Sequence, residues 1–170
     1  MILKTLALAG GLGGAAALSQ FPEFSQQYVQ RLGGAVDELT RVAADFDASA
    51  ASVGLSREAA LAQMQGTDFV ARRRVDMERS FARLERLEAD LAALRGHGPF
   101  MRAYRSASLS DRDIAARTWG DFAPAVPLNR AGAIFAALGF VAGWGGLRAL
   151  AGLLRRVLPR RNPRSGPAGA

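Results

Sequence analysis

The sequence predicts an all-α protein in which two transmembrane helices are joined by a periplasmic helical hairpin or small bundle. Three observations predict this class: apolar stretches near both ends, helical spacing of apolar residues between them, and no alternating strand pattern. We expect a first transmembrane helix over residues 1–21 and a periplasmic helical region over 22–129. A second transmembrane helix over 130–155 and a disordered, Arg- and Pro-rich cytoplasmic tail over 156–170 complete the expected chain.

The first apolar stretch, residues 5–19, consists mostly of Leu, Ala and Gly. It has the layout of a signal peptide, with small residues at Ala15 and Ala17 that resemble a cleavage site. Only Lys4 precedes the run, however, and no polar spacer separates Ala17 from Leu18. We therefore favour a retained span, and cleavage after Ala17 stays open as the alternative.

The central region contains two stripes of apolar residues at helical spacing. The mean step is about 3.67 residues in the first and 3.4 in the second, so no single period is sustained and a short antiparallel hairpin is favoured over an extended coiled coil. Ser56 is placed to cap a short helix over 57–65 between them. Gly33 and Gly34 interrupt the first stripe, either as a weak point or as a close contact with a neighbouring helix. The stripes are Phe24, Tyr28, Leu32, Val36, Leu39, Val42, Phe46 and Met77, Phe81, Leu84, Leu87, Leu91, Leu94.

The second apolar stretch is the stronger candidate span. Residues 131–147 carry no charge and would rise about 26 Å as a helix, against a bilayer core of roughly 30 Å. Continuing to Leu154 gives about 36 Å, provided that Arg148 extends its long side chain towards the near surface. Trp144 would then lie close to that interface. A buried helix in a soluble core is the alternative, but a small core rarely holds a helix that is apolar on all sides.

Glycines at a spacing of four suggest that the two spans pack together. Gly10 and Gly14 share one helix face, Gly139 and Gly143 repeat the spacing, and Gly146 continues it with Ala142. Small residues at such positions let two membrane helices approach closely. The alternative is that Gly and Ala are simply common in this chain.

The distribution of charge predicts the orientation. All 15 acidic residues lie between Glu23 and Asp121, whereas the net charge of +7 comes from Lys4 and six Arg beyond residue 147. A nucleic-acid-binding protein would carry its charge on the folded binding face, so we expect no nucleic-acid partner. Positive charge beside membrane spans marks the cytoplasmic side. We therefore expect a bacterial inner-membrane protein with both termini cytoplasmic and residues 20–130 periplasmic. The expected membrane-interface residues are Lys4, Trp144, Arg148, Arg155 and Arg156.

The residues that usually carry chemistry are scarce. The chain has no Cys and one His, His97, which lies in a Gly-Pro turn. Asp111 and Asp113 are two residues apart and would not share a helix face. No phosphate-binding loop or nucleophile motif is present. We therefore expect no catalytic residue, no cofactor and no metal, and interpret Arg72–Arg74 as a solvated face.

Two blocks resemble a known family: QFPEFSQQYVQRLGGAVDEL at residues 20–39 and FAPAVPLNRAG at 122–132. They are similar to small proteobacterial inner-membrane proteins known as domain of unknown function 2937, with the resemblance covering about residues 1–155. The resemblance implies two spans with a helical segment between them and favours a retained first span. In such proteins the Pro-Leu pair is typically followed by Thr and an acidic residue. Here Asn129 and Arg130 follow it, which leaves a helix-capping role open for Asn129. The family offers no catalytic or binding residues to transfer.

These observations favour a non-enzymatic structural or interaction protein, as an accessory subunit of a larger membrane complex. Its expected partners are membrane lipid and other membrane or envelope proteins. The alternative is a membrane-anchored periplasmic binding module for lipid or peptidoglycan that uses Arg72–Arg74 or the Arg-rich tail. An enzyme would require a fold that brings distant carboxylates together in a pocket.

Overall fold

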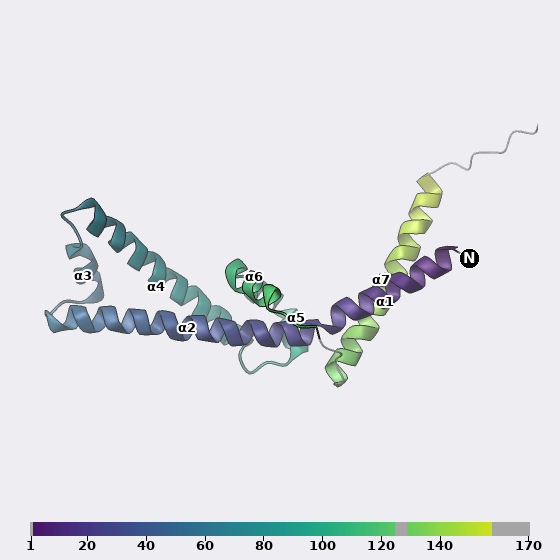
Figure 1. Cartoon of the computed structure of the whole chain (residues 1–170), viewed down its shortest axis with the longest axis horizontal. Helices are drawn as coiled ribbons and strands as arrows, with labels where there is room; N and C mark the ends of the chain where they lie inside the picture. The colour runs from purple at the N-terminus through teal and green to yellow at the C-terminus, as the bar shows by residue number, and fades with distance from the viewer. Residues whose placement is uncertain (1, 125–128, 158–170) are drawn as a thin grey trace, which may run out of the picture. The chain divides into compact units, whose positions relative to one another are not determined.

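The computed structural model describes residues 2–124 and 129–157, with side chains described as far as Arg155. Every regular element in these ranges is a helix, which confirms the predicted all-α class (Figure 1). The expected tail over 156–170 lies largely outside the described residues. The elements are α1 (Ile2–Ser19), α2 (Phe21–Ser52), α3 (Arg57–Gln63), α4 (Asp68–Leu94), α5 (Pro99–Tyr104), the 3-10 helix η1 (Ser106–Ser108), α6 (Arg112–Gly120) and α7 (Arg130–Val157).

The chain forms two compact units. The terminal unit comprises residues 1–21 and 125–170, and the central unit comprises residues 22–124. The terminal unit contains α1 and α7, the two helices predicted as spans, and the central unit contains α2 to α6.

Helices α1 and α7 pack against each other and cross (Figure 1). The segments Ile2–Ser52 and Arg130–Arg155 are long and apolar enough to cross a membrane, although length and composition alone are weak evidence. Only 17% and 11% of the residues in their most apolar stretches are buried, so neither stretch is a core helix of this fold. A water-soluble domain rarely leaves so much contiguous apolar surface exposed.

The start of α7 is fixed by a side-chain cap. The Gly132 N–H donates a hydrogen bond of 2.7 Å to Oδ1 of Asn129. An N-cap oxygen satisfies one of the backbone donors that a helix leaves unpaired at its first turn. Asn129 therefore has the capping role that the sequence left open.

In the central unit, α2, α4 and α6 share one apolar core. The core contains residues from the N-terminal half of the first predicted stripe and the C-terminal half of the second. The two helices converge at that end and separate towards α3 (Figure 1). Val42, further along α2, is already 36% exposed. The core residues are Tyr28, Leu32 and Val36 of α2, Leu87, Leu91 and Leu94 of α4, and Ile114 of α6.

Helix α3 lies at the end where α2 and α4 separate (Figure 1), and none of its residues is buried. The Ser56 hydroxyl caps it, as predicted, by accepting from the Ala59 N–H at 3.2 Å. Gly66, with a φ of 109°, makes the turn into α4, a conformation that side chains with a Cβ rarely adopt. Phe46 and Phe81 meet at this end with ring centroids 5.4 Å apart.

The two glycines within α2 do not mark a helix–helix contact. A Cβ built on Gly33 would meet only the Arg95 side chain, at an ordinary 3.5 Å, and one on Gly34 would meet nothing within 4 Å. The interpretation of a close approach to a neighbouring helix is therefore wrong. The remaining interpretation is that Gly33 and Gly34 form a weak point in α2, because glycine has a low helix propensity.

Candidate functional site

The closest contact of the terminal unit is made by four of the five predicted packing glycines. Gly10 and Gly14 of α1 face Gly143 and Gly139 of α7, respectively. A Cβ on Gly139 or Gly143 would lie nearer to a carbonyl oxygen of α1 than real Cβ atoms do. Because the lower number of one helix pairs with the higher number of the other, α1 and α7 run antiparallel.

Gly146 does not take part in this contact. A Cβ built on it would meet nothing within 4 Å, whereas the neighbouring Leu147 side chain lies against Gly10. Gly146 lies one turn beyond Gly143, outside the positions where an added Cβ would meet α1. The sequence spacing placed Gly146 on the same face but could not show where the helices separate.

Two further contacts of this helix pair were not predicted. Gly11 is buried against the ring of Phe140, where an added Cβ would lie 2.7 Å from a ring carbon. Phe21 and Phe135 meet at the other end, with ring centroids 5.4 Å apart. The sequence did contain a signal for Gly11, because Ala7, Gly11 and Gly14 are small residues spaced four and three apart on one helix face. Ala7 is also buried.

The predicted interface residues gather at one end of the helix pair. Lys4 of α1 and Trp144, Arg148 and Arg155 of α7 line one pocket. The Arg148 guanidinium lies 4.6 Å from the centroid of the Trp144 ring, in a cation–π contact. The side chain of Arg156 lies outside the described residues.

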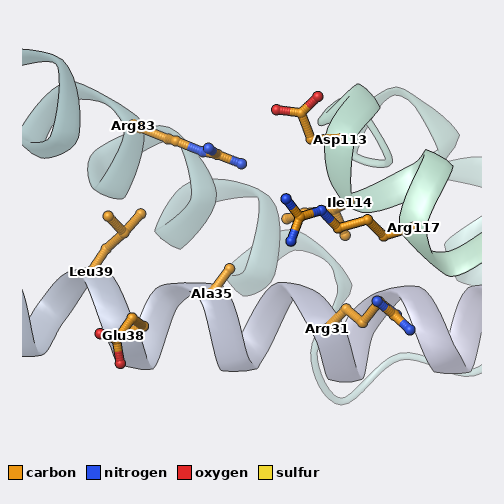
Figure 2. A pocket seen from close by; sticks show the side chains of 8 residues that line it. All are labelled: Arg31, Ala35, Glu38, Leu39, Arg83, Asp113, Ile114 and Arg117. Carbon is orange, nitrogen blue, oxygen red and sulfur yellow. The ribbon is translucent and has the colours of Figure 1, made fainter.

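The central unit has a groove between α2, α4 and α6 (Figure 2). Its volume is about 310 Å³, and its lining mixes three arginines with two carboxylates and three apolar side chains. The lining residues are Arg31, Ala35, Glu38, Leu39, Arg83, Asp113, Ile114 and Arg117.

Two of the three arginines at this groove are already paired. Arg31 forms an ion pair with Asp121, and Arg83 donates to Asp111 at 3.2 Å. Arg117, Asp113 and Glu38 are exposed. The groove therefore offers mixed charges to a partner and no concentrated positive charge for an anion.

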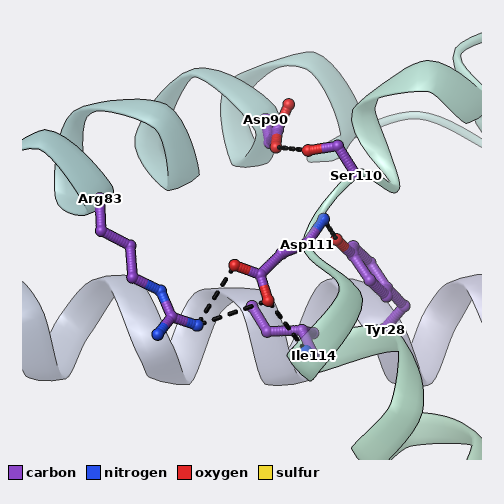
Figure 3. Close-up of polar contacts among 6 residues, drawn as sticks. All are labelled: Tyr28, Arg83, Asp90, Ser110, Asp111 and Ile114. Carbon is purple, nitrogen blue, oxygen red and sulfur yellow. Dashed lines mark hydrogen bonds and ion pairs between the residues drawn. The ribbon is translucent and has the colours of Figure 1, made fainter.

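Asp111 connects all three core helices (Figure 3). Its Oδ1 accepts from the Ile114 N–H at 2.9 Å and so caps α6, while its carboxylate receives Arg83 of α4. Its own N–H donates to the Tyr28 hydroxyl of α2 at 3.2 Å. The side chain of Asp111 is only 12% exposed. This aspartate therefore has a structural role. Nothing in the sequence distinguishes it from Asp113.

Tyr28 is fully buried beneath this network. Burial raises the pKa of its phenol because the phenolate would lose its hydration. The hydrogen bond from the Asp111 N–H opposes this shift, since it stabilises the phenolate. The net shift of the pKa is upward, so the phenol is protonated at neutral pH.

Arg72–Arg74 lie on the surface of α4, as the solvated-face interpretation requires. Arg73 and Arg74 lie 3.6 Å from Asp76 and 3.8 Å from Glu78, respectively. Arg72 and Arg74 line a shallow groove that also contains Asp68. Acidic side chains therefore share this surface with the arginines.

Metal-binding geometry is not found in residues 2–124 and 129–157: no three His, Asp or Glu side chains lie where they could hold an ion. His97 lies in the turn between α4 and α5.

Comparison with known proteins gives one match. The family described as "Protein of unknown function (DUF2937)" matches residues 2–160. That range includes both apolar helices and the whole central unit. Neither a curated protein nor a solved structure matches the chain.

Proposed function

The chain belongs to the DUF2937 family, whose description names no activity, and we propose that it is a non-enzymatic structural or interaction protein of the bacterial inner membrane. In this proposal α1 and α7 span the membrane, both termini are cytoplasmic, and the helical region between them is periplasmic. The central unit contacts other membrane or envelope proteins as an accessory subunit of a larger complex.

The terminal unit supports the membrane anchor. Its apolar helices are exposed over most of their surface and pack through glycines, as expected where lipid replaces water. Their antiparallel arrangement brings the start of α1 and the end of α7 to one end of the pair, together with Lys4, Arg148 and Arg155. The positive-inside rule assigns such an end to the cytoplasm.

The observation that carries the interaction role is the exposure of large apolar side chains on α5 and α6. Tyr104 is 85% exposed and Trp119 72%, and Phe100 and Met101 are also exposed. Trp119 also joins a cluster with Phe24 and Phe122, whose ring centroids lie 6.1 and 6.2 Å from its own. Exposed aromatic side chains are typical of the centres of protein–protein interfaces.

Site-specific photo-crosslinking in living cells tests this role. A benzophenone amino acid at Tyr104 or Trp119 should give discrete adducts with another envelope protein. The same group at Glu85, exposed on α4, is the matched control and should give none. If positions 104 and 119 give no more adduct than position 85, and the chain is a lone monomer in several mild detergents, the interaction role is wrong.

The alternative of lipid or peptidoglycan binding through Arg72–Arg74 has less support. These arginines share their surface with Asp68, Asp76 and Glu78, which reduces the positive potential available to an anionic ligand. In the terminal unit, by contrast, no acidic side chain accompanies the basic ones.

A further inference from the structure

The pocket at the charged end of the helix pair combines positive charge with apolar walls. Its volume is about 560 Å³. Lys4 comes from α1, and Arg148 and Arg155 come from α7. The apolar walls are formed by Leu3, Leu8 and Trp144. Neither helix alone forms this pocket, so it depends on the antiparallel glycine contact.

The two arginines lie on one face of α7. They are seven residues apart, which is close to two helical turns, and therefore differ in depth by about 10 Å. Arg155 follows the apolar stretch that ends at Leu154, whereas Arg148 lies inside it. In a membrane, a charge at the position of Arg148 needs either a route to the surface or an anion that meets it.

The terminal unit provides no such anion. Every Asp and Glu of the chain lies between Glu23 and Asp121, so residues 1–21 and 125–170 contain none. Within the described part of the chain, Lys4, Arg148 and Arg155 form no ion pair. The contact of Arg148 with the Trp144 ring orients the guanidinium but leaves its charge uncompensated. No acidic side chain of the unit can neutralise these charges, so an anion that meets them would come from outside it.

We propose that this pocket binds an anionic phospholipid of the leaflet in which it lies. The phosphate lies among Lys4, Arg148 and Arg155, and an acyl chain follows the apolar walls at Leu8 and Trp144. Basic pockets between transmembrane helices on the cytoplasmic side are a known type of site for anionic lipid head groups. A free phosphate ion would use the cations but gain nothing from the apolar walls. The assignment rests on the proposed membrane position of α1 and α7.

Lipid binding to the full chain in mild detergent tests the assignment. Native mass spectrometry would compare phosphatidylglycerol with phosphatidylethanolamine of the same acyl chains, and thermal unfolding would be followed with each lipid and with inorganic phosphate. We expect retained adducts and a higher unfolding temperature with phosphatidylglycerol only. Arg148→Gln, Arg155→Gln and Lys4→Gln should each weaken this binding by about fivefold, the effect of about one basic residue near an anionic surface.

The control is Arg130→Gln, which removes an exposed arginine at the other end of the same helix. It should leave the affinity for phosphatidylglycerol unchanged. All variants should unfold at the wild-type temperature without added lipid, which separates loss of binding from loss of folding.

Three outcomes would overturn the assignment: equal binding of both lipids, equal weakening by Arg130→Gln and Arg148→Gln, or full reproduction of the effect by inorganic phosphate. A separate experiment tests the proposal that α1 and α7 span the membrane, which would be wrong if the chain were only peripherally bound. In that case alkaline carbonate would release the chain from membranes. A chain that resists carbonate but shows no lipid preference would refute the lipid site alone.

Discussion

The absence of a Cβ atom at four glycines allows α1 and α7 to pack closely. A Cβ on Gly14, Gly139 or Gly143 would clash with backbone atoms of the other helix, whereas one on Gly10 would first meet the Leu147 side chain. At Gly146, one turn from Gly143, there is room for one. The same substitution should therefore have opposite effects at positions that look equivalent in the sequence.

Gly143→Ala and Gly146→Ala form a matched pair that tests the contact. The added methyl at 143 would lie 2.8 Å from the Gly10 carbonyl carbon, and such overpacking typically costs about 1–3 kcal/mol. At 146 the methyl meets nothing, so the higher helix propensity of Ala should stabilise by up to about 1 kcal/mol. Unfolding of the full chain by denaturing detergent measures both. Equal effects of the two variants would contradict the observed packing.

Asp111 and Asp113 form a second pair. Asp111→Ala removes the cap of α6 and the partner of Arg83, for a loss of about 2–3 kcal/mol in the free energy of unfolding. Asp113 is exposed in the first turn of the same helix, where its replacement should cost less than about 1 kcal/mol. Chemical denaturation followed by circular dichroism compares them. If both variants lose the same free energy, Asp111 does not organise the central unit.

Among the helices, α3 depends on one ion pair more than on packing. The Arg57 Nε donates to Asp47 of α2 at 2.7 Å, and its guanidinium lies 4.5 Å from the Phe81 ring centroid of α4. Because α3 buries no residue, Arg57 provides the contacts that connect its first turn to both long helices. The pKa of Asp47 is lowered, first by the hydrogen bond from Arg57.

This lowered pKa gives the pair a defined pH dependence. Its stabilisation is present above the unfolded-state value of about 3.8 and is lost as the pH falls through the lower folded-state pKa. Asp47→Asn should therefore be less stable than wild type at pH 7, and the difference should shrink below about pH 4. Asp45→Asn, an exposed neighbour, should match wild type throughout. A difference that stays constant down to pH 2 would contradict the role of the Asp47 charge.

Most helix positions could be predicted because local residues determine them. Ser56 caps α3, the Gly-Pro turn separates α4 from α5, and the apolar periods mark α2 and α4. The short helix expected over 57–65 accordingly forms over Arg57–Gln63. The polar connections between helices could not be predicted. Arg83 and Asp111, or Arg57 and Asp47, are ordinary charges in a chain rich in them, and only the fold selects these partners.

The chain as a whole combines an apolar helix pair without acidic residues and a central unit that contains every one of them. This division agrees with the proposed membrane-spanning anchor, whose helices carry few charges. The family match over residues 2–160 includes both parts. The proposed two-span arrangement requires a retained α1, because cleavage after Ala17 would remove most of α1 and the contact that it makes with α7.

The most direct test of the two-span arrangement uses the absence of cysteine in this chain. Single cysteines are introduced as Ala62→Cys in α3 and Ser165→Cys near the C-terminus, and are labelled with a membrane-impermeant maleimide before and after lysis of spheroplasts. The mass of the N-terminus is measured on the same protein. We predict that position 62 reacts in intact spheroplasts, that position 165 reacts only after lysis, and that the N-terminal segment is present. Protection of position 62, reaction of position 165 before lysis, or a chain that begins at Leu18 would contradict the two-span membrane protein.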